Sequence, residues 1–237
     1  MTEELFREDA ALAECDAVVT AVDERGVQLD RTVFYPHDDS QAGDRGELVL
    51  VDGRAIAIAD TRKGETPGEI VHVLANADEH GALAVGTRVR ARIDVARRRA
   101  HMRFHTATHL LCAIVPHPTN GCSITADYAR LDFDMVEPLE REPLERELAR
   151  LVGGAHEVRT VWITDEELDA KPELVRTMSV KPPRGVGRIR LLEIAGVDLQ
   201  PCGGTHVANT REIGALRIVK IEKKSARSRR VVLEFSA

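Results

Sequence analysis

The sequence is poor in aromatic residues and has no paired cysteine motif. Phe, Trp and Tyr make up 3% of its 237 residues, which argues against aromatic stacking as the main means of holding unpaired bases. No two cysteines form a CxxC pair, and this excludes a zinc ribbon and a thioredoxin-like redox motif. The four cysteines are Cys15, Cys112, Cys122 and Cys202.

The chain also lacks an excess of basic charge and a long apolar run. Its formal net charge is −6, so a nucleic-acid surface must come from local clustering of Lys and Arg. No run approaches the roughly 18 apolar residues of a membrane span, and the charged residues 1–9 contain no apolar signal core. We therefore expect a cytoplasmic protein without a membrane partner.

Short strand-like runs fill the first part of the chain. The apolar runs 17–22 and 27–30 flank the turn Asp23-Glu24-Arg25-Gly26, a pattern typical of a hairpin. Turn signals such as Asp52-Gly53 separate the runs that follow. These runs cover residues 48–51, 54–59, 70–74 and 88–93. Short strands at this spacing predict a small β-barrel domain over residues 1–93.

Residues 94–237 mix helical and strand-like patterns. After an arginine-rich boundary near residues 94–102, a helix containing His105 is expected to run to about Val115 and to stop before Pro116. Further helices are expected over residues 139–153 and after a cap at Thr164. Strands are expected at 122–126, 130–134, 157–163, 186–194, 215–222 and 229–235. The predicted class is α+β: a small N-terminal β-barrel, then an α+β domain with an antiparallel sheet.

Two short motifs carry most of the residues suited to chemistry. His105 and His109 are four residues apart, so both imidazoles fall on one face of a helix and can reach one metal ion. The motif Cys202-Gly203-Gly204-Thr205-His206 adds a thiolate and an imidazole on a segment that two glycines allow to bend tightly. A His, His, Cys, His set suits zinc, so the sequence predicts a zinc site.

Each of the two motifs alone is weak evidence for a metal site, and together they leave alternatives to a catalytic zinc site open. The HxxxH motif is not that of a metalloprotease, because Thr106 stands where HExxH places its glutamate base. A closed structural zinc site and a metal-free His/Cys pocket fit the same residues. No acid near the motifs stands out as a general base. The flanking His101 and His117 are expected to be exposed or capping histidines.

The segments HTATHLL and CGGTH together resemble the editing domain shared by alanyl-tRNA synthetases and the free-standing AlaX proteins, which hydrolyse mischarged alanine tRNA. The resemblance extends to Arg103-Phe104-His105 and to residues 127–134 and 199–207. Phe34-Tyr35-Pro36 and residues 41–46 resemble the additional domain of the medium-length AlaX form. Between these two segments the family usually has a glycine-rich run, whereas this chain has His37-Asp38-Asp39-Ser40.

The resemblance implies a zinc-dependent aminoacyl-tRNA deacylase, with residues 94–237 as the editing domain. Zinc held by His105, His109 and Cys202, with His206 as fourth ligand or near neighbour, would form the catalytic site. Its substrate would be serine, or also glycine, esterified to alanine tRNA. The alternatives are a tRNA-binding module with a purely structural zinc, and an enzyme that edits another mischarged tRNA, such as a threonine tRNA. The oligomeric state stays open.

Selectivity and tRNA binding suggest further candidates. An editing site can hydrogen-bond the serine hydroxyl, which alanine lacks. Candidate groups for this contact follow the zinc helix: Thr119, Asn120, Ser123 and Thr125. Basic residues near the C-terminus, together with the arginine run 97–99, are expected to line a phosphate track, because only Glu222 opposes them between residues 217 and 230. These residues are Arg217, Lys220, Lys223, Lys224, Arg227, Arg229 and Arg230.

Overall fold

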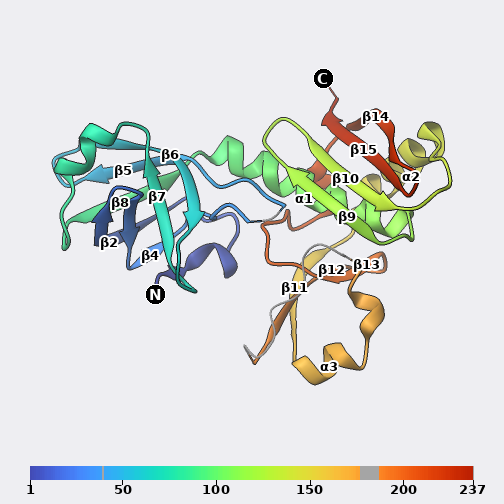
Figure 1. Cartoon of the computed structure of the whole chain (residues 1–237), viewed down its shortest axis with the longest axis horizontal. Coiled ribbons are helices and arrows are strands. Elements are labelled where there is room, and N and C mark those ends of the chain that lie inside the picture. The colour runs from blue at the N-terminus through green and yellow to red at the C-terminus, as the bar shows by residue number, and fades with distance from the viewer. Residues whose placement is uncertain (39, 177–186, 237) are drawn as a thin grey trace. The chain divides into compact units, whose positions relative to one another are not determined.

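The computed structural model describes residues 1–38, 40–176 and 187–236. The chain divides into two compact units, Met1–Arg99 and Ala100–Ala237 (Figure 1). One closed barrel, several helices and further antiparallel sheets confirm the predicted α+β class and the predicted N-terminal barrel. No helix in the described ranges is long and apolar enough to cross a membrane.

The first unit is a six-stranded barrel whose strands pair in the order β2-β3-β7-β6-β5-β8. Alternating side chains fill it: on β8, Val89, Ala91 and Ile93 are buried while the arginines between them face outward. The barrel strands are β2 (Glu14–Asp23), β3 (Gly26–Leu29), β5 (Gly46–Leu50), β6 (Ala55–Lys63), β7 (Ile70–Leu74) and β8 (Arg88–Ile93). The short β1 (Glu3–Glu4) and β4 (Arg31–Thr32) pair in parallel.

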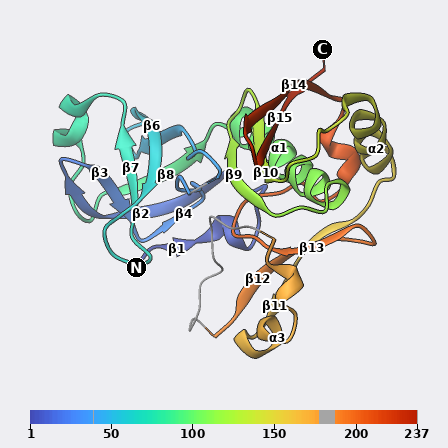
Figure 2. The ribbon, with the colours of Figure 1, turned by 45° about the vertical axis from the view of Figure 1, so that its right-hand side comes forward.

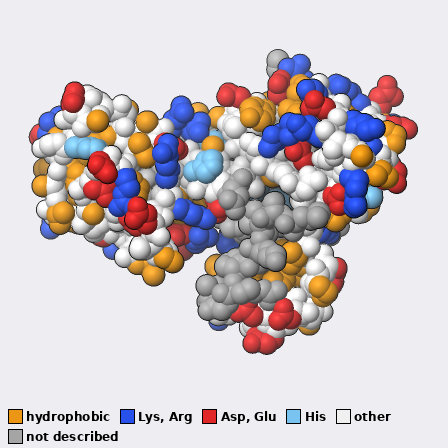
Figure 3. Space-filling model, in the orientation of Figure 1, with side chains coloured by type: hydrophobic (Ala, Val, Ile, Leu, Met, Phe, Trp, Pro, Cys, Tyr) orange, Lys and Arg blue, Asp and Glu red, His pale blue; other side chains and the backbone are white. Residues whose placement is uncertain are grey.

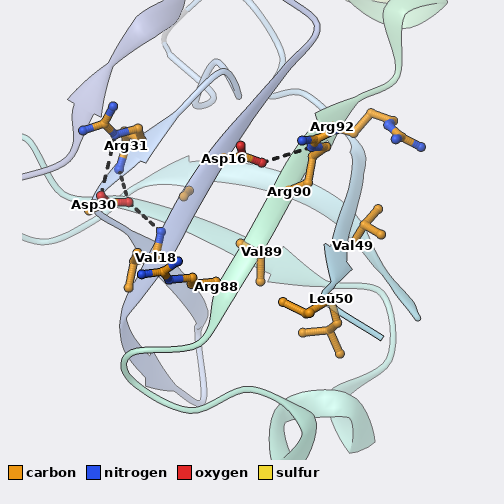
Figure 4. A pocket seen from close by; sticks show the side chains of 12 residues that line it. Asp16, Val18, Asp30, Arg31, Val49, Leu50, Arg88, Val89, Arg90 and Arg92 are labelled. Carbon is orange, nitrogen blue, oxygen red and sulfur yellow. Dashed lines mark hydrogen bonds and ion pairs between the residues drawn. The ribbon is translucent and has the colours of Figure 1, made fainter. Parts of the chain in front are cut away.

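The outward arginines of β8 line an open groove on the barrel (Figure 4). Arg90 lies 3.0 Å from Asp16, and Arg92 lies 3.1 Å from both Glu14 and Glu47. Acids from the neighbouring strands therefore neutralise most of this positive charge. None of the predicted site residues lines the groove.

The segment with the unusual His37-Asp38-Asp39-Ser40 sequence follows β4. The Asp38 carboxylate lies 2.7 Å from Lys63 Nζ, and His37 forms an isolated bridge with Arg62. Asp39 lies outside the described residues. The described part of this loop is thus tied to β6 of its own barrel.

A buried ion pair joins the segment before β5 to the helix that follows β8. Arg98 pairs with Asp44, and its guanidinium also donates to the carbonyls of Val33 at 2.6 Å and Ala10 at 2.7 Å. Asp44 accepts a hydrogen bond from the Tyr35 backbone N–H at 2.7 Å. Both charged side chains are almost fully buried. The prediction that Arg98 contacts phosphates is therefore wrong, because its side chain is an internal anchor.

His72 is a second polar group buried in the barrel. Its Nδ1 donates to the Val27 carbonyl at 3.0 Å, so its Nε2 accepts from the Thr32 hydroxyl at 2.8 Å. This arrangement satisfies the neutral ring. Burial lowers the pKa of His72 from 6.5 to about 4.

We expect the barrel to lose stability as the pH falls from about 6.5 to about 4. In that window the unfolded His72 binds a proton and the folded one does not, so acid favours unfolding. The loss should reach ~3 kcal/mol. Urea unfolding of the wild type and of His72→Gln at pH of about 7, 5.5 and 4.5, values that cover most of this window, measures the loss of stability. The variant should show a flatter pH dependence, and identical curves would contradict this role.

Helix α1 (Val95–Ile114) begins in the first unit and continues into the second. It ends just before Pro116, as expected, but it starts earlier than predicted. Asp94 caps it by accepting from the Arg97 N–H at 3.0 Å, and arginine is a good helix former. The arginine run is therefore the first turn of the helix that carries His105 and His109.

The second unit contains a four-stranded antiparallel sheet in the order β14-β15-β10-β9 (Figure 2). Phe104 of α1 stacks on Phe235 of β15 with ring centroids 3.9 Å apart, which packs the helix against this sheet. The predicted C-terminal hairpin is confirmed, with longer strands and a tighter turn. The strands are β9 (Thr119–Ile124), β10 (Ala129–Asp134), β14 (Leu216–Ser225) and β15 (Ser228–Phe235). Helix α2 (Arg141–Gly153) buries Leu144, Leu148 and Leu151.

A smaller antiparallel sheet holds β11 (Val158–Ile163), β12 (Ile189–Ile194) and β13 (Asp198–Pro201) in that order. Helix α3 (Asp165–Asp169) is capped by Thr164, as the sequence predicts, and the Thr164 and Glu167 side chains form a capping box. Leu168 of α3 packs on Ile189 and Leu191, so this helix covers one face of the sheet. β13 is a strand that the sequence analysis did not predict, and Val186, the predicted start of β12, lies outside the described residues.

Candidate metal centre

Four predicted ligands meet in the second unit. One donor atom from each of His105, His109, Cys202 and His206 lies within 4.8 Å of all the others. The Cys202 Sγ is 3.4 Å from His105 Nε2 and 3.2 Å from His206 Nε2. The three histidines are buried and Cys202 is half-buried. Two motifs about ninety residues apart in sequence therefore form one cluster.

The elements that carry these residues explain the convergence. His105 and His109 are one turn apart on α1, with ring centroids 5.5 Å apart. Cys202 follows β13, where its N–H donates to the Arg190 carbonyl at 3.2 Å. Arg190 Nη1 in turn donates to the carbonyls of Cys202 at 2.6 Å and Gly204 at 3.1 Å. The glycine turn is thus fastened to β12, which aims Cys202 and His206 at the helix.

Thr106 sets which nitrogen of His206 is available. Its hydroxyl donates to the Met102 carbonyl at 2.9 Å, so its oxygen can accept from His206 Nδ1, which lies 3.3 Å away. The proton of the neutral ring is then on Nδ1, and Nε2 presents its lone pair beside the Cys202 sulfur. Thr106, which the sequence analysis used only to exclude a protease, is therefore a positioning residue.

An acid that the sequence analysis missed lies behind His109. Asp198 Oδ2 is 3.5 Å from His109 Nδ1, and its Oδ1 is 3.1 Å from Arg176 Nη1. Gln200 donates to the same carboxylate at 2.6 Å. Alternation along β13 puts Asp198 and Gln200 on the face that continues to Cys202. The sequence signal for Asp198 was its i, i+2, i+4 spacing with Gln200 and Cys202. That spacing places the three residues on one face only if the segment is a strand.

The charges within the cluster favour metal-binding forms of its side chains. Burial would raise the pKa of the Cys202 thiol, but the surrounding imidazoles outweigh it and hold the pKa well below its usual value. Burial lowers the pKa of His206 to about 3. At His109 burial is outweighed by Cys202 and Asp198, which raise the pKa to about 9. A thiolate and a neutral imidazole are ready to bind, whereas His109 must release its proton to a metal.

The donor set and its spacing fit a tetrahedral ion. Zinc bonds of ~2.0 Å to nitrogen and ~2.3 Å to sulfur place neighbouring donors roughly 3.5 Å apart. The two sulfur–nitrogen distances of 3.4 and 3.2 Å are close to that value. Three nitrogens and one sulfur are also the donors that zinc accepts in proteins. The four residues can therefore hold a metal ion.

Comparison with known proteins identifies the family. The model of the threonyl and alanyl tRNA synthetase second additional domain matches residues 189–232, and that of class II (A) tRNA synthetases matches residues 6–97. The alanyl-tRNA editing protein AlaX-M of Methanosarcina acetivorans is 34% identical over 98% of both chains. The chain belongs to the AlaX family.

Other relatives cover the same span. The AlaX-M protein of Saccharolobus solfataricus is 33% identical over 98% of both chains. The alanine–tRNA ligase of Metallosphaera sedula is 36% identical over 94% of this chain, but over only 25% of its own length. This AlaX chain is thus similar along nearly its whole length to free-standing editing proteins and to one part of a ligase.

The predicted substrate-binding residues of this AlaX chain differ in their surroundings. Thr119 is buried, and its N–H donates to the carbonyl of Arg176, whose side chain reaches Asp198. The Thr125 hydroxyl is used in the turn after β9, where it donates to the Tyr128 carbonyl at 3.1 Å. Ser123 pairs with Arg130 on the face opposite to buried Ile124, and Asn120 is exposed at a β-bulge. All four contacts with substrate stay predictions, and Thr119 has the surroundings that best suit one.

Two further residues of α1, His101 and Cys112, are buried close to the ligand histidines in sequence. His101 is fully buried, so its prediction as an exposed or capping histidine is wrong. It is one helical turn before His105, on the face of α1 that packs inward. Cys112, on the same helix, is buried, and burial raises the pKa of its thiol to about 12. A thiol with that pKa stays protonated and is a poor metal ligand.

The predicted phosphate track on the C-terminal hairpin is largely neutralised. Arg230 forms a bidentate pair with Asp132 at 2.7 Å, and buried Arg229 donates to backbone carbonyls, including that of Glu137. The remaining pairs are Arg227 with Asp134, Arg217 with Glu234 and Lys220 with Glu222. Figure 3 shows basic and acidic side chains interleaved on this surface. The hairpin is therefore not the continuous basic strip that its sequence predicts, although Lys223 and Lys224 are exposed.

Proposed function

We propose that this chain is a zinc-dependent deacylase that hydrolyses the ester between serine and alanine tRNA, with glycine as a second target. The observation that carries the proposal is the convergence of His105, His109, Cys202 and His206. The AlaX-M relatives, which are named alanyl-tRNA editing proteins, support the substrate class. The half-buried Cys202 supports access of an ester to the cluster, since a sealed structural site would bury every ligand.

The side chains of the cluster would hold the ion and its surroundings in place. His206 is proposed as the fourth ligand, supported by the Thr106 contact that leaves its Nε2 free beside the sulfur. When bound, zinc supplies a Lewis acid that can polarise the ester carbonyl or activate a water. Thr119 is proposed to bind the serine hydroxyl, because it is buried and its N–H contacts the backbone of Arg176, whose side chain reaches Asp198. Alanine would leave that polar group without a partner.

The proposal is tested by the deacylation of alanine tRNA charged with serine, glycine or alanine. We expect the seryl ester to be hydrolysed faster than the alanyl ester by a factor on the order of 10² or more, because only serine can bond a buried polar group. Equal rates would refute editing. Tight tRNA binding without turnover would favour a binding module with a structural zinc. Faster turnover of a mischarged threonine tRNA would change the substrate.

Asp198 offers a test of how the ion is held. We expect Asp198→Asn to weaken zinc binding 10- to 100-fold, roughly the usual effect of removing a carboxylate that orients a ligating histidine. Competition with a chromogenic chelator measures this directly. The exposed Asp127→Asn serves as a control and should leave zinc affinity unchanged. Unchanged affinity in Asp198→Asn would show that the carboxylate does not orient His109.

A further inference from the structure

Trp162 is a large aromatic side chain left exposed beside the candidate metal centre. It is the only tryptophan in the sequence, and 47% of its surface is exposed. It lies on β11, the edge strand of the three-stranded sheet. Folding normally buries tryptophan, so an exposed one marks a candidate contact surface.

The strand register connects Trp162 with the metal centre. Trp162 pairs with Arg190 of β12, and the Cys202 N–H donates to the Arg190 carbonyl. Directly paired residues project from the same face of a sheet. Trp162, Arg190 and Cys202 therefore form one row across the three chain segments, on the face that carries Gln200 and Asp198. With ~4.8 Å between neighbouring strands, the ends of this row are roughly 10 Å apart.

The two faces of this sheet differ in what covers them. Leu168 of the acidic helix α3 packs with Val161, Ile163 and Ile189, which all project from the opposite face. The acidic helix α3 therefore covers the face of the sheet opposite to Trp162. On the face of Trp162, the next residue along β11 is Thr160, which is also exposed. This face combines an aromatic ring, a neighbouring arginine and Cys202 of the candidate metal centre.

We propose that Trp162 is a stacking platform for the terminal adenine base of the tRNA acceptor end. The inference rests on the proposed function, because it takes the substrate to be an aminoacyl ester of that terminal nucleoside. The ester and the base are attached to the same ribose, so a base whose ester lies at the cluster must lie within one nucleoside of it. A platform about two strand spacings from Cys202 meets that requirement. A single well-placed ring suffices, despite the low aromatic content of the chain.

Arg190 has a supporting part in this arrangement. Its Nη1 is committed to the carbonyls of Cys202 and Gly204, so it fixes the distance between the platform and the cluster. Stacking of one base on an aromatic side chain is worth roughly a 5- to 150-fold change in affinity. Binding of the terminal base would therefore contribute measurably to the affinity for tRNA.

Tryptophan fluorescence tests the proposal directly, because the signal of the intact protein comes from Trp162 alone. The probes are uncharged alanine tRNA with its complete 3′ end and the same tRNA lacking the terminal adenosine. We expect quenching by the complete tRNA and a much weaker change with the shortened one. Equal responses to the two tRNAs, or no response to the complete one, would overturn the platform.

Steady-state kinetics provide an independent readout. We expect Trp162→Ala to raise KM for seryl-tRNA by about tenfold, with kcat changed less than twofold, and Trp162→Phe to recover most of the loss. Thr160→Ala, on the same exposed face, is the control and should change neither. An unchanged KM in Trp162→Ala overturns the inference, and so does a loss that Trp162→Phe fails to recover. If the wild type deacylates no seryl-tRNA, the proposed function fails instead.

Discussion

Replacing Cys202 with serine should reduce kcat/KM for seryl-tRNA deacylation by roughly 10³-fold. The Cys202 sulfur is within 3.4 Å of two ligand nitrogens, and its thiol pKa is held well below the usual value, so it is the anionic donor of the cluster. A serine hydroxyl stays neutral and is a poor zinc ligand. Initial rates with saturating zinc, together with zinc content by atomic absorption, measure the effect.

The matched control is Cys15→Ser, which changes a half-buried cysteine in the barrel unit. It should retain the wild-type rate and zinc content. Circular dichroism separates two explanations for an inactive Cys202→Ser. A folded but inactive variant supports a catalytic site, whereas an unfolded one indicates a structural zinc. A folded Cys202→Ser with activity within tenfold of the wild type would refute the role of the thiolate.

Replacing Arg98 with methionine should cost about 3–5 kcal/mol of unfolding free energy. The change leaves Asp44 buried without its cation and frees the carbonyls of Val33 and Ala10 from their donor. Burial already raises the pKa of Asp44 against the effect of Arg98, so removing the arginine leaves a charge that the interior does not support. Urea unfolding at about pH 7, where carboxylates are ordinarily ionised, measures this loss of unfolding free energy.

A neighbouring arginine provides the comparison. Arg97 is only half-buried, and its guanidinium donates to the Gly43 carbonyl at 3.2 Å. Arg97→Met should therefore cost about 1 kcal/mol. Pairing Arg98→Met with Asp44→Asn should recover part of the loss, since the asparagine carbonyl can still accept from Tyr35. If Arg98→Met is no more harmful than Arg97→Met, the buried pair is not an anchor.

The barrel could be predicted from the sequence because its information is local. On β8, arginine alternates with Val89, Ala91 and Ile93, and this period of two predicts a strand even when the partner strands are unknown. The start of α1 was missed for a related reason. A dense arginine run suggests a boundary, yet it forms a helix once Asp94 caps it and Arg98 finds a buried carboxylate.

In the candidate site, too, the features set by local sequence could be predicted, and those that depend on distant residues could not. The spacing of His105 and His109, and the glycines before His206, were enough to predict that four ligands converge. The Asp198 contact with His109 depends on β13 pairing with β12, and no local pattern specifies that pairing. The basic hairpin was misjudged similarly, because Asp132 is 98 residues away from Arg230 in the sequence.

The most direct test of the account is the deacylation rate of metal-free protein as zinc is added back. We predict that the rate of seryl-tRNA hydrolysis rises in proportion to zinc and levels off at one ion per chain, which is the capacity of the single His/Cys cluster found among the described residues. Full activity in the metal-free, folded protein would contradict the account.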